Sequence, residues 1–246
     1  MRDVLNRREI IVSYGDHQGE SALREALSLY AGRARGVAAG PEEIVVGAGS
    51  QPLLYLLCGL AGRRRAAIDE HGFAQAEQVF HDCGIEVIPL PRDENGLDPK
   101  ALRASGADLA YVSPSASVDS GSAMPTSRRF ELLRWAQETG GILIEDDYNG
   151  ELRYRAHPIP AMQGMPGGDR VAYLGSFSKL LLPSVRIGYM VLPPSLLTLY
   201  REEGAQLQPN GVKDRTARPR GLHCERSDGT PSPSADANFT PSKANA

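Results

Sequence analysis

Short apolar stretches alternate along the chain with segments in which apolar residues recur every three or four positions. The short stretches are typical of buried strands, and the periodic segments are typical of amphipathic helices. The expected strands span residues 43–46, 66–68, 85–90, 109–113, 141–145, 171–174 and 187–192. The expected helices span residues 21–33, 52–60, 73–82, 127–138 and 194–203. This alternation predicts an α/β fold with a mostly parallel, covered sheet, in which ligands bind at the carboxyl ends of the strands.

The apolar pattern ends near Leu207. Beyond it, the large apolar side chains are Val212, Leu222 and Phe239. A segment so rich in Pro, Ser, Arg and Asp cannot bury enough apolar surface to offset the entropy cost of ordering it. We expect residues 208–246 to be a disordered tail, whose abrupt onset suggests a frameshift or a truncation. We expect residues 14–203 to form one domain, preceded by an N-terminal segment over residues 1–13.

Composition and charge narrow the class of protein. The 246 residues carry a net charge of −3, with 41% hydrophobic and 23% charged residues, as in ordinary globular proteins. The sequence has no apolar run near the roughly 20 residues that span a bilayer, and its first residues lack the apolar core of a signal peptide. Its three cysteines and scattered histidines fit no zinc or redox motif. We expect a cytoplasmic protein with no metal site, no membrane contact and no direct nucleic-acid binding.

The strongest chemical signal is a turn that follows the expected strand at residues 171–174. It brings Ser176, Ser178 and Lys179 together, and Arg186 follows seven residues after the lysine. A pyridoxal 5'-phosphate site needs an amine for the aldehyde, hydroxyl donors for the phosphate and a guanidinium that grips phosphate. Taken alone, the turn fits an exposed loop lysine better, so the hypothesis depends on the rest of the sequence.

The expected strand at residues 141–145 runs into two carboxylates and a phenol, at Asp146, Asp147 and Tyr148. Facing a pyridinium nitrogen, a carboxylate would be paired, and it would keep the nitrogen protonated so that the ring withdraws electrons. Because neighbouring strand residues point to opposite faces, only one aspartate can line such a site, and we expect Asp146. The alternative is a turn in which Asp147 caps a helix.

Two further turns follow expected strands. In the first, Ser50 and Gln51 follow a small-residue turn and precede Pro52 at a helix start, where backbone N–H groups bind phosphate well. In the second, Phe73 follows a strand and could stack on a pyridine ring. The alternatives are a plain connection between strand and helix, and a core phenylalanine on the next helix.

Together, these motifs resemble the fold-type-I aminotransferases, and most closely the aminotransferase-like half of the MocR branch of GntR-family bacterial transcriptional regulators. The resemblance runs from about Tyr14 to Pro194. The motifs that carry it are Tyr14–Gly19 followed by Leu23 and Arg24, Glu145–Tyr148 followed by Glu151, Arg153 and Tyr154, and Gly175–Lys179. It implies the three-layer large domain of a pyridoxal-phosphate-dependent transferase, with a mostly parallel sheet.

The resemblance also implies roles for individual residues. Lys179 would form the Schiff base with pyridoxal 5'-phosphate, Asp146 would pair with the pyridine nitrogen, and Tyr148 would hydrogen-bond to the phenolic oxygen. Phe73 would stack on the ring. The residues implied around the phosphate are Ser50, Gln51, Ser176, Ser178 and Arg186. The family further implies an amino-acid substrate or effector and a homodimer.

The sequence departs from the family at several places. The loop at residues 113–121 has Ala116 and Asp119 where the family has a cofactor-binding side chain and a proline, and His71 replaces another proline. We find no counterpart of the C-terminal small domain, which in the family grips the substrate carboxylate, or of the N-terminal helix-turn-helix. Three functions therefore stay open: an aminotransferase or a domain descended from one, the effector-sensing domain of a regulator that responds through aldimine formation, or a non-functional truncated remnant.

Overall fold

The computed structural model of the chain describes residues 16–70, 72–115, 123–148, 160–177 and 186–203. All of them belong to one compact unit, Met1–Asp214, whereas a second unit, Arg215–Ala246, lies outside the described residues. The expected tail and N-terminal segment also lie outside this range, so they stay predictions.

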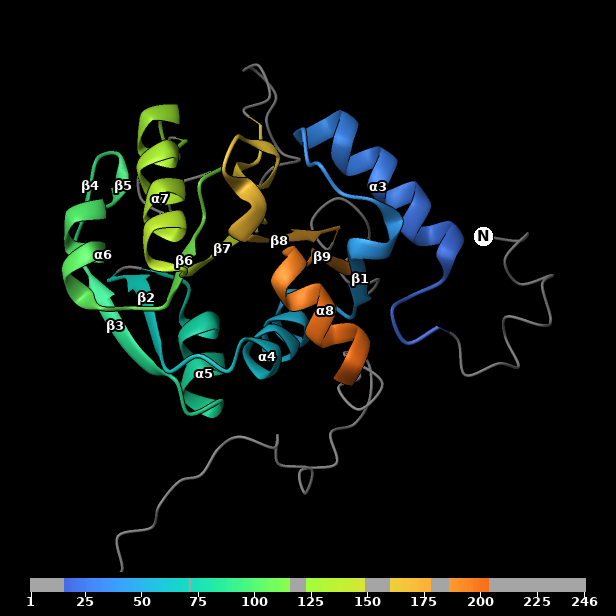
Figure 1. Cartoon of the computed structure of the whole chain (residues 1–246), viewed down its shortest axis with the longest axis horizontal. Helices are drawn as coiled ribbons and strands as arrows, with labels where there is room; N and C mark the ends of the chain where they lie inside the picture. Colours follow the sequence, from blue (N-terminus) through green and yellow to red (C-terminus); the bar gives the residue numbers. More distant parts are fainter. Residues whose placement is uncertain (1–15, 71, 116–122, 149–159, 178–185, 204–246) are drawn as a thin grey trace, which may run out of the picture. The chain divides into compact units, whose positions relative to one another are not determined.

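A seven-stranded sheet forms the centre of the compact unit (Figure 1). In spatial order the strands are β1 (Ile44–Gly47), β9 (Gly188–Val191), β8 (Val171–Ser176), β7 (Ile142–Asp147), β6 (Leu109–Val112), β2 (Arg65–Asp69) and β3 (Glu86–Leu90). β9 runs antiparallel to both of its neighbours, and the other neighbouring pairs are parallel. The carboxyl ends of the parallel strands therefore meet the amino end of β9 at one edge, which confirms the predicted mostly parallel sheet.

Helices cover both faces of the sheet, so the unit has the three layers expected (Figure 1). The first face packs against α4 (Ser50–Ala61), α5 (Ala74–Asp82) and α8 (Pro194–Glu203). The second face packs against α6 (Pro99–Ser105), α7 (Thr126–Thr139) and α3 (Ser21–Arg35). Short 3₁₀ turns lie at Pro41–Glu43 (η1), Met162–Gly164 (η2) and Gly168–Arg170 (η3).

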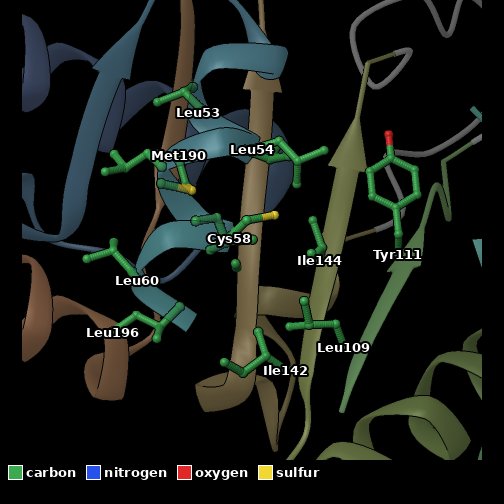
Figure 2. Close-up of a cluster of buried hydrophobic side chains, with 14 of the residues drawn as sticks. Leu53, Leu54, Cys58, Leu60, Leu109, Tyr111, Ile142, Ile144, Met190 and Leu196 are labelled. Atoms are coloured by element: carbon green, nitrogen blue, oxygen red, sulfur yellow. The ribbon is translucent and has the colours of Figure 1, made fainter. Parts of the chain in front are cut away.

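The central strands β6, β7 and β9 are buried on both faces, so their side chains divide between two apolar layers. Figure 2 shows Ile142 and Ile144 of β7 in the layer that also holds Leu54 and Cys58 of α4. Leu143, between the two isoleucines, belongs to the opposite cluster under α7. Because alternate residues of a strand face opposite sides, this register decides where the carboxylates at the end of β7 point.

Gln18 and Arg24 belong to the first of the motifs shared with the family, here called the N-terminal motif, and they anchor the edge strand β1. The Gln18 amide donates hydrogen bonds of 2.9 Å to the carbonyls of both Glu42 and Ile44, and the Gln18 carbonyl accepts a 2.9 Å bond from the Val46 N–H. The guanidinium of Arg24 bonds to Asp16 and to two backbone carbonyls. These contacts position β1, and with it the turn that leads into α4.

The structure also contains elements absent from the sequence prediction. They are the helix α6 and a small hairpin of β4 (Arg92–Asp93) and β5 (Gly96–Leu97). The start of α6 has a clear local signal, because the Asp98 carboxylate accepts a 2.9 Å bond from the Lys100 N–H and Pro99 occupies the first helical turn. At seven residues, α6 is too short for a clear helical period in the sequence.

Candidate functional site

A pocket lies at the edge of the sheet where the parallel strands end. It encloses about 210 Å³ of empty space, part of it open to solvent. Its lining includes Ser50, Gln51, Phe73, Tyr111, Asp146 and Leu174. Four of the residues predicted from the sequence thus lie around one pocket, although they come from three separate segments of the chain.

The register of β7 separates its two terminal aspartates. Asp146 has the same parity as Ile142 and Ile144 and lines the pocket on the α4 and α5 side. Asp147 lies on the opposite face, where its carboxylate forms a 2.5 Å ion pair with Arg35 of α3. Both aspartates are 3% exposed. Geometry therefore leaves Asp146 as the aspartate available to a ligand in the pocket.

Asp146 is hydrogen-bonded by a tyrosine from the neighbouring strand. The Tyr111 hydroxyl donates to Oδ2 of Asp146, and both side chains are buried. Burial first of all, and then the negative charge of Asp146, raise the pKa of Tyr111 well above its ordinary value, so the phenol stays protonated and acts as the donor. Sequence reasoning missed Tyr111, although a tyrosine inside a fully buried strand needs a partner for its hydroxyl.

A polar network contacts the end of β7 on the side away from the pocket. Besides the ion pair with Arg35, Asp147 accepts a 2.8 Å hydrogen bond from the Tyr173 hydroxyl, and Arg35 donates a 2.8 Å bond to the hydroxyl of Ser115. Glu145, on the same face, accepts bonds of 2.9 and 3.1 Å from the backbone N–H groups of Met162 and Gln163. Asp147 therefore connects β7 to β8 and α3. The residues that follow Tyr148 lie outside the described ones, so the alternative in which Asp147 caps a helix is not tested.

The start of α4 is arranged to receive an anion. Its N-cap, Gly49, has a φ of 108° and provides no capping side chain, and the first turn carries no acidic residue. The first N–H groups of the helix are therefore free of a side-chain cap, at the end where the helix dipole is positive. A guanidinium lies over the same turn, because Nε of Arg186 donates a 3.4 Å hydrogen bond to the Ala48 carbonyl.

Close backbone packing brings Arg186 to this turn. Gly188 opens β9, and a Cβ atom added there would lie 2.8 Å from the carbonyl carbon of Gly49. Any side chain at position 188 would therefore push β9 away from the turn. Since β9 is antiparallel, the residues that precede it reach the edge at which the parallel strands end, and the predicted arginine joins the predicted phosphate turn.

Two aromatic rings lie near each other beside the pocket, and one of them, Phe73, is part of its lining. Phe73, at the N-cap of α5, and Tyr148, directly after β7, have nearly parallel rings with 12° between their planes and 6.4 Å between their centroids. Phe73 is 41% exposed, so part of its side chain is accessible. Burial, followed by the charge of Asp146, raises the pKa of Tyr148.

The remaining predicted residues divide into two groups. Ser176 ends β8 and is partly buried, opposite Gly188 of β9. Ser178 and Lys179 lie outside the described residues, as do His71, Ala116 and Asp119. Gln75 lines the pocket and was not predicted, since nothing in the sequence distinguishes it from a surface residue of the helix.

Two absences concern only the residues that the structure describes. Within them, there is no group of three or more His, Cys, Asp or Glu side chains that could hold a metal ion. In the same part of the chain, every helix is too short or too polar to cross a membrane.

Comparison with known proteins gives the site its context. Residues 4–205 match the family described as "Aminotransferase class I and II". The chain is 42% identical over 184 residues to the uncharacterized HTH-type transcriptional regulator YhdI of Bacillus subtilis (strain 168), an alignment that covers 74% of this chain and 39% of that protein. It is 34% identical over 187 residues to the probable rhizopine catabolism regulatory protein MocR of Rhizobium meliloti, covering 74% and 38%.

A solved structure shows a similar fold. Kynurenine aminotransferase of Pyrococcus horikoshii, in complex with PMP, matches with a TM-score of 0.71 at 28% identity, over 84% of this chain and 55% of that chain. The chain thus spans about two fifths of the regulators that it matches and about half of this aminotransferase.

Proposed function

The chain belongs to the class I and II aminotransferase family, and from this premise we propose that it binds pyridoxal 5'-phosphate at the carboxyl edge of its sheet and uses it to recognise an amino acid. The observation that carries the proposal is the pocket in which Asp146 and Phe73 lie beside the start of α4. The family's resident cofactor requires a carboxylate, an aromatic face and a phosphate site, and these three features meet there.

The chemistry of the donor set fits this cofactor. Gly49, Ser50 and Gln51 open α4 without a side-chain cap, so their N–H groups suit a phosphate, and the Arg186 guanidinium adds a positive charge at the same turn. The buried carboxylate of Asp146 belongs to the lining of the same pocket. The start of α4 and Arg186 would bind the dianionic phosphate, and the Asp146 carboxylate would bind the protonated ring nitrogen.

Each of the chain's own residues at the site would then have a separate role. When bound, pyridoxal 5'-phosphate supplies an aldehyde that condenses with amines and a ring that withdraws electrons from them. Asp146 would hold a proton on the ring nitrogen, and Phe73 would cover the ring and exclude water. Tyr148 would donate to the phenolic oxygen, and the amine of Lys179 would attach the cofactor covalently. Ser176 and Ser178 would add hydroxyl donors to the phosphate site.

The site could serve transamination or amino-acid sensing, and one observation favours sensing. Transamination would make the chain part of an enzyme, and amino-acid sensing would make it the effector domain of a transcriptional regulator. The identity to the regulator YhdI is 42%, whereas the identity to the kynurenine aminotransferase is 28%. We therefore infer that sensing of an amino acid is the better supported use, with a homodimer in the cytoplasm as the working form.

Covalent labelling tests the cofactor proposal. Purified chain is incubated with pyridoxal 5'-phosphate, reduced with borohydride and digested, and the labelled peptide is identified by mass spectrometry. We expect the label on the peptide that contains Lys179 and its loss in Lys179→Ala. The matched control is Lys100→Ala, which removes a lysine from the first turn of α6 and should leave labelling unchanged. A label spread over several lysines would contradict the proposal.

A second experiment separates sensing from transamination. Chain loaded with the cofactor is mixed with a panel of amino acids, and its absorption spectrum is followed over a single turnover. Sensing predicts a saturable spectral change that reverses when the amino acid is removed. Conversion of the bound cofactor to its amine form, with release of a keto acid, would instead identify a transaminase.

A further inference from the structure

Tyr111 projects from β6 into the pocket, and the proposed function gives it no part so far. We propose that Tyr111 is a positioning residue for Asp146: its hydroxyl holds the carboxylate in the charged form and in the orientation that a protonated ring nitrogen needs. The inference rests on the proposed function, because it concerns how the pocket prepares Asp146 for that ligand.

The pairing of β6 and β7 places the two side chains together. Tyr111 lies opposite Ile144 in the parallel register, so Asp146 is two residues further along and on the same face. The Tyr111 hydroxyl donates to Oδ2 of Asp146, and each residue is only 3% exposed. A hydrogen bond to a buried carboxylate strongly favours its charged form, since little water is present to solvate it.

Packing keeps the Tyr111 ring in place. The ring of Phe80 from α5 meets it edge-on, with 6.2 Å between centroids and 79° between planes. A hydrogen bond with the Ser113 side chain engages the same phenol. Figure 2 shows Tyr111 at the border of the apolar cluster that holds Ile144 and Leu54. These contacts stabilise the ring in the orientation that brings its hydroxyl to Asp146.

The charges around Asp146 are consistent with this direction of hydrogen bonding. Among the described residues, the charge of Asp146 raises the pKa of Tyr111, from β6, and of Tyr148, directly after β7. Burial raises the pKa of both phenols, so both stay neutral near neutral pH. Tyr111 therefore donates without adding a charge, and the negative charge of Asp146 is preserved for a cationic ligand.

The test compares two tyrosines that each donate to one aspartate of β7. Tyr111→Phe removes the hydroxyl beside Asp146. Tyr173→Phe is the matched control, because it removes a buried hydroxyl that donates a 2.8 Å bond to Asp147 on the opposite face. The affinity of the whole chain for pyridoxal 5'-phosphate is measured by fluorescence titration, and folding is monitored by urea unfolding. We expect Tyr111→Phe to weaken binding about tenfold and Tyr173→Phe to change it less than about twofold.

A double-mutant cycle separates positioning from a general structural effect. In an Asp146→Asn background, Tyr111→Phe should have almost no further effect on affinity, because the carboxylate on which it acts is gone. Additive losses would overturn the proposal, as would an unchanged affinity in Tyr111→Phe. If Tyr111→Phe does not fold, Ser113→Ala replaces it, and it must weaken binding in the same direction for the inference to stand.

The outcome for the wild type distinguishes the two proposals. Binding by the wild type together with normal binding by Tyr111→Phe would overturn this inference and leave the proposed function intact. Failure of the wild type to bind the cofactor would overturn the proposed function, and the inference that rests on it would fall too.

Discussion

Three consecutive acidic residues at the end of β7 have three different partners. Glu145 accepts backbone N–H groups from η2, Asp146 accepts the Tyr111 hydroxyl in the pocket, and Asp147 pairs with Arg35. All three side chains are buried. At the residue scale, the alternation of side chains along β7 thus places the Asp146 carboxylate in the pocket and the carboxylates of Glu145 and Asp147 in the polar network outside it.

Substitution of the two aspartates should separate these roles. Asp147→Asn leaves the buried Arg35 without its ion pair, and breaking such a pair typically costs about 3–5 kcal/mol. Asp146→Asn should instead weaken pyridoxal 5'-phosphate binding by about tenfold or more, since it removes the charge that would face the ring nitrogen. Urea unfolding and cofactor titration of both variants give the comparison. Equal effects of the two substitutions on binding would contradict the assignment of Asp146.

Glu145 should make the stability of the fold depend on pH. Burial raises its pKa from 4.5 to about 7, although two backbone N–H groups oppose the shift. The folded chain therefore holds the proton more tightly than the unfolded chain. The resulting stabilisation is complete below the unfolded pKa of 4.5 and is lost as the pH rises through about 7.

Glu145→Gln tests this dependence, because glutamine cannot ionise. Between about pH 5 and about pH 8, the wild type should lose up to about 3 kcal/mol of unfolding free energy relative to the variant. The matched control is Glu138→Gln, at a side chain on α7 that is 53% exposed, which should behave like the wild type. Parallel pH profiles for wild type and Glu145→Gln would show that Glu145 is not the group responsible.

At the scale of elements, the start of α4 joins several parts of the fold. The N-terminal motif anchors β1, β1 ends in the turn at Gly49, and Gly188 brings β9 and Arg186 against that turn. The anion site is therefore built by two strands and a helix, and it depends on backbone shape as much as on side chains.

Gly49→Ala should disturb this turn. Alanine is strained at a φ of 108°, and its Cβ would lie 3.3 Å from Nη2 of Arg186. We expect a loss of stability of about 1–3 kcal/mol and a roughly threefold to tenfold loss of affinity for pyridoxal 5'-phosphate. Gly62→Ala, at the other end of α4 with a φ of 55° and open space around it, is the control. It should cost about 1 kcal/mol of stability and leave the affinity unchanged.

At the scale of the whole molecule, the pocket draws on three neighbouring strands of the sheet and two helices. Its lining comes from α4, α5, β6, β7 and β8, so a ligand there would touch elements far apart in sequence. Such a ligand binds only the folded state, because the unfolded chain has no pocket. Its binding free energy is therefore added to the stability of the whole unit.

Thermal unfolding should show this linkage. At a cofactor concentration of about 100 times the dissociation constant, pyridoxal 5'-phosphate should add about 2.7 kcal/mol to the unfolding free energy and raise the melting temperature. Asp146→Asn should show a smaller rise at the same concentration. An unchanged melting temperature in the wild type, at any concentration of the cofactor, would contradict binding to the folded unit.

The local pattern of the sequence was enough to predict the class of fold and most of its elements. Strands such as β7 and β8 were found because each is a compact apolar run, and α7 was found from its helical period. Order along the chain then placed Ser50, Phe73 and Asp146 at strand ends, and in a parallel sheet strand ends share one edge. These features depend on neighbours in sequence, so the sequence by itself determined them.

Only the tertiary structure decided which side chains touch. Arg35 and Asp147 are 112 residues apart in sequence, and no local pattern predicts their ion pair. The contact of Tyr111 with Asp146 depends on the register of β6 against β7, and a slip by one residue would turn either side chain to the opposite face. Register is set by the packing of both faces of the sheet at once. The contacts of Asp146 and Asp147 could therefore be identified only in the folded chain.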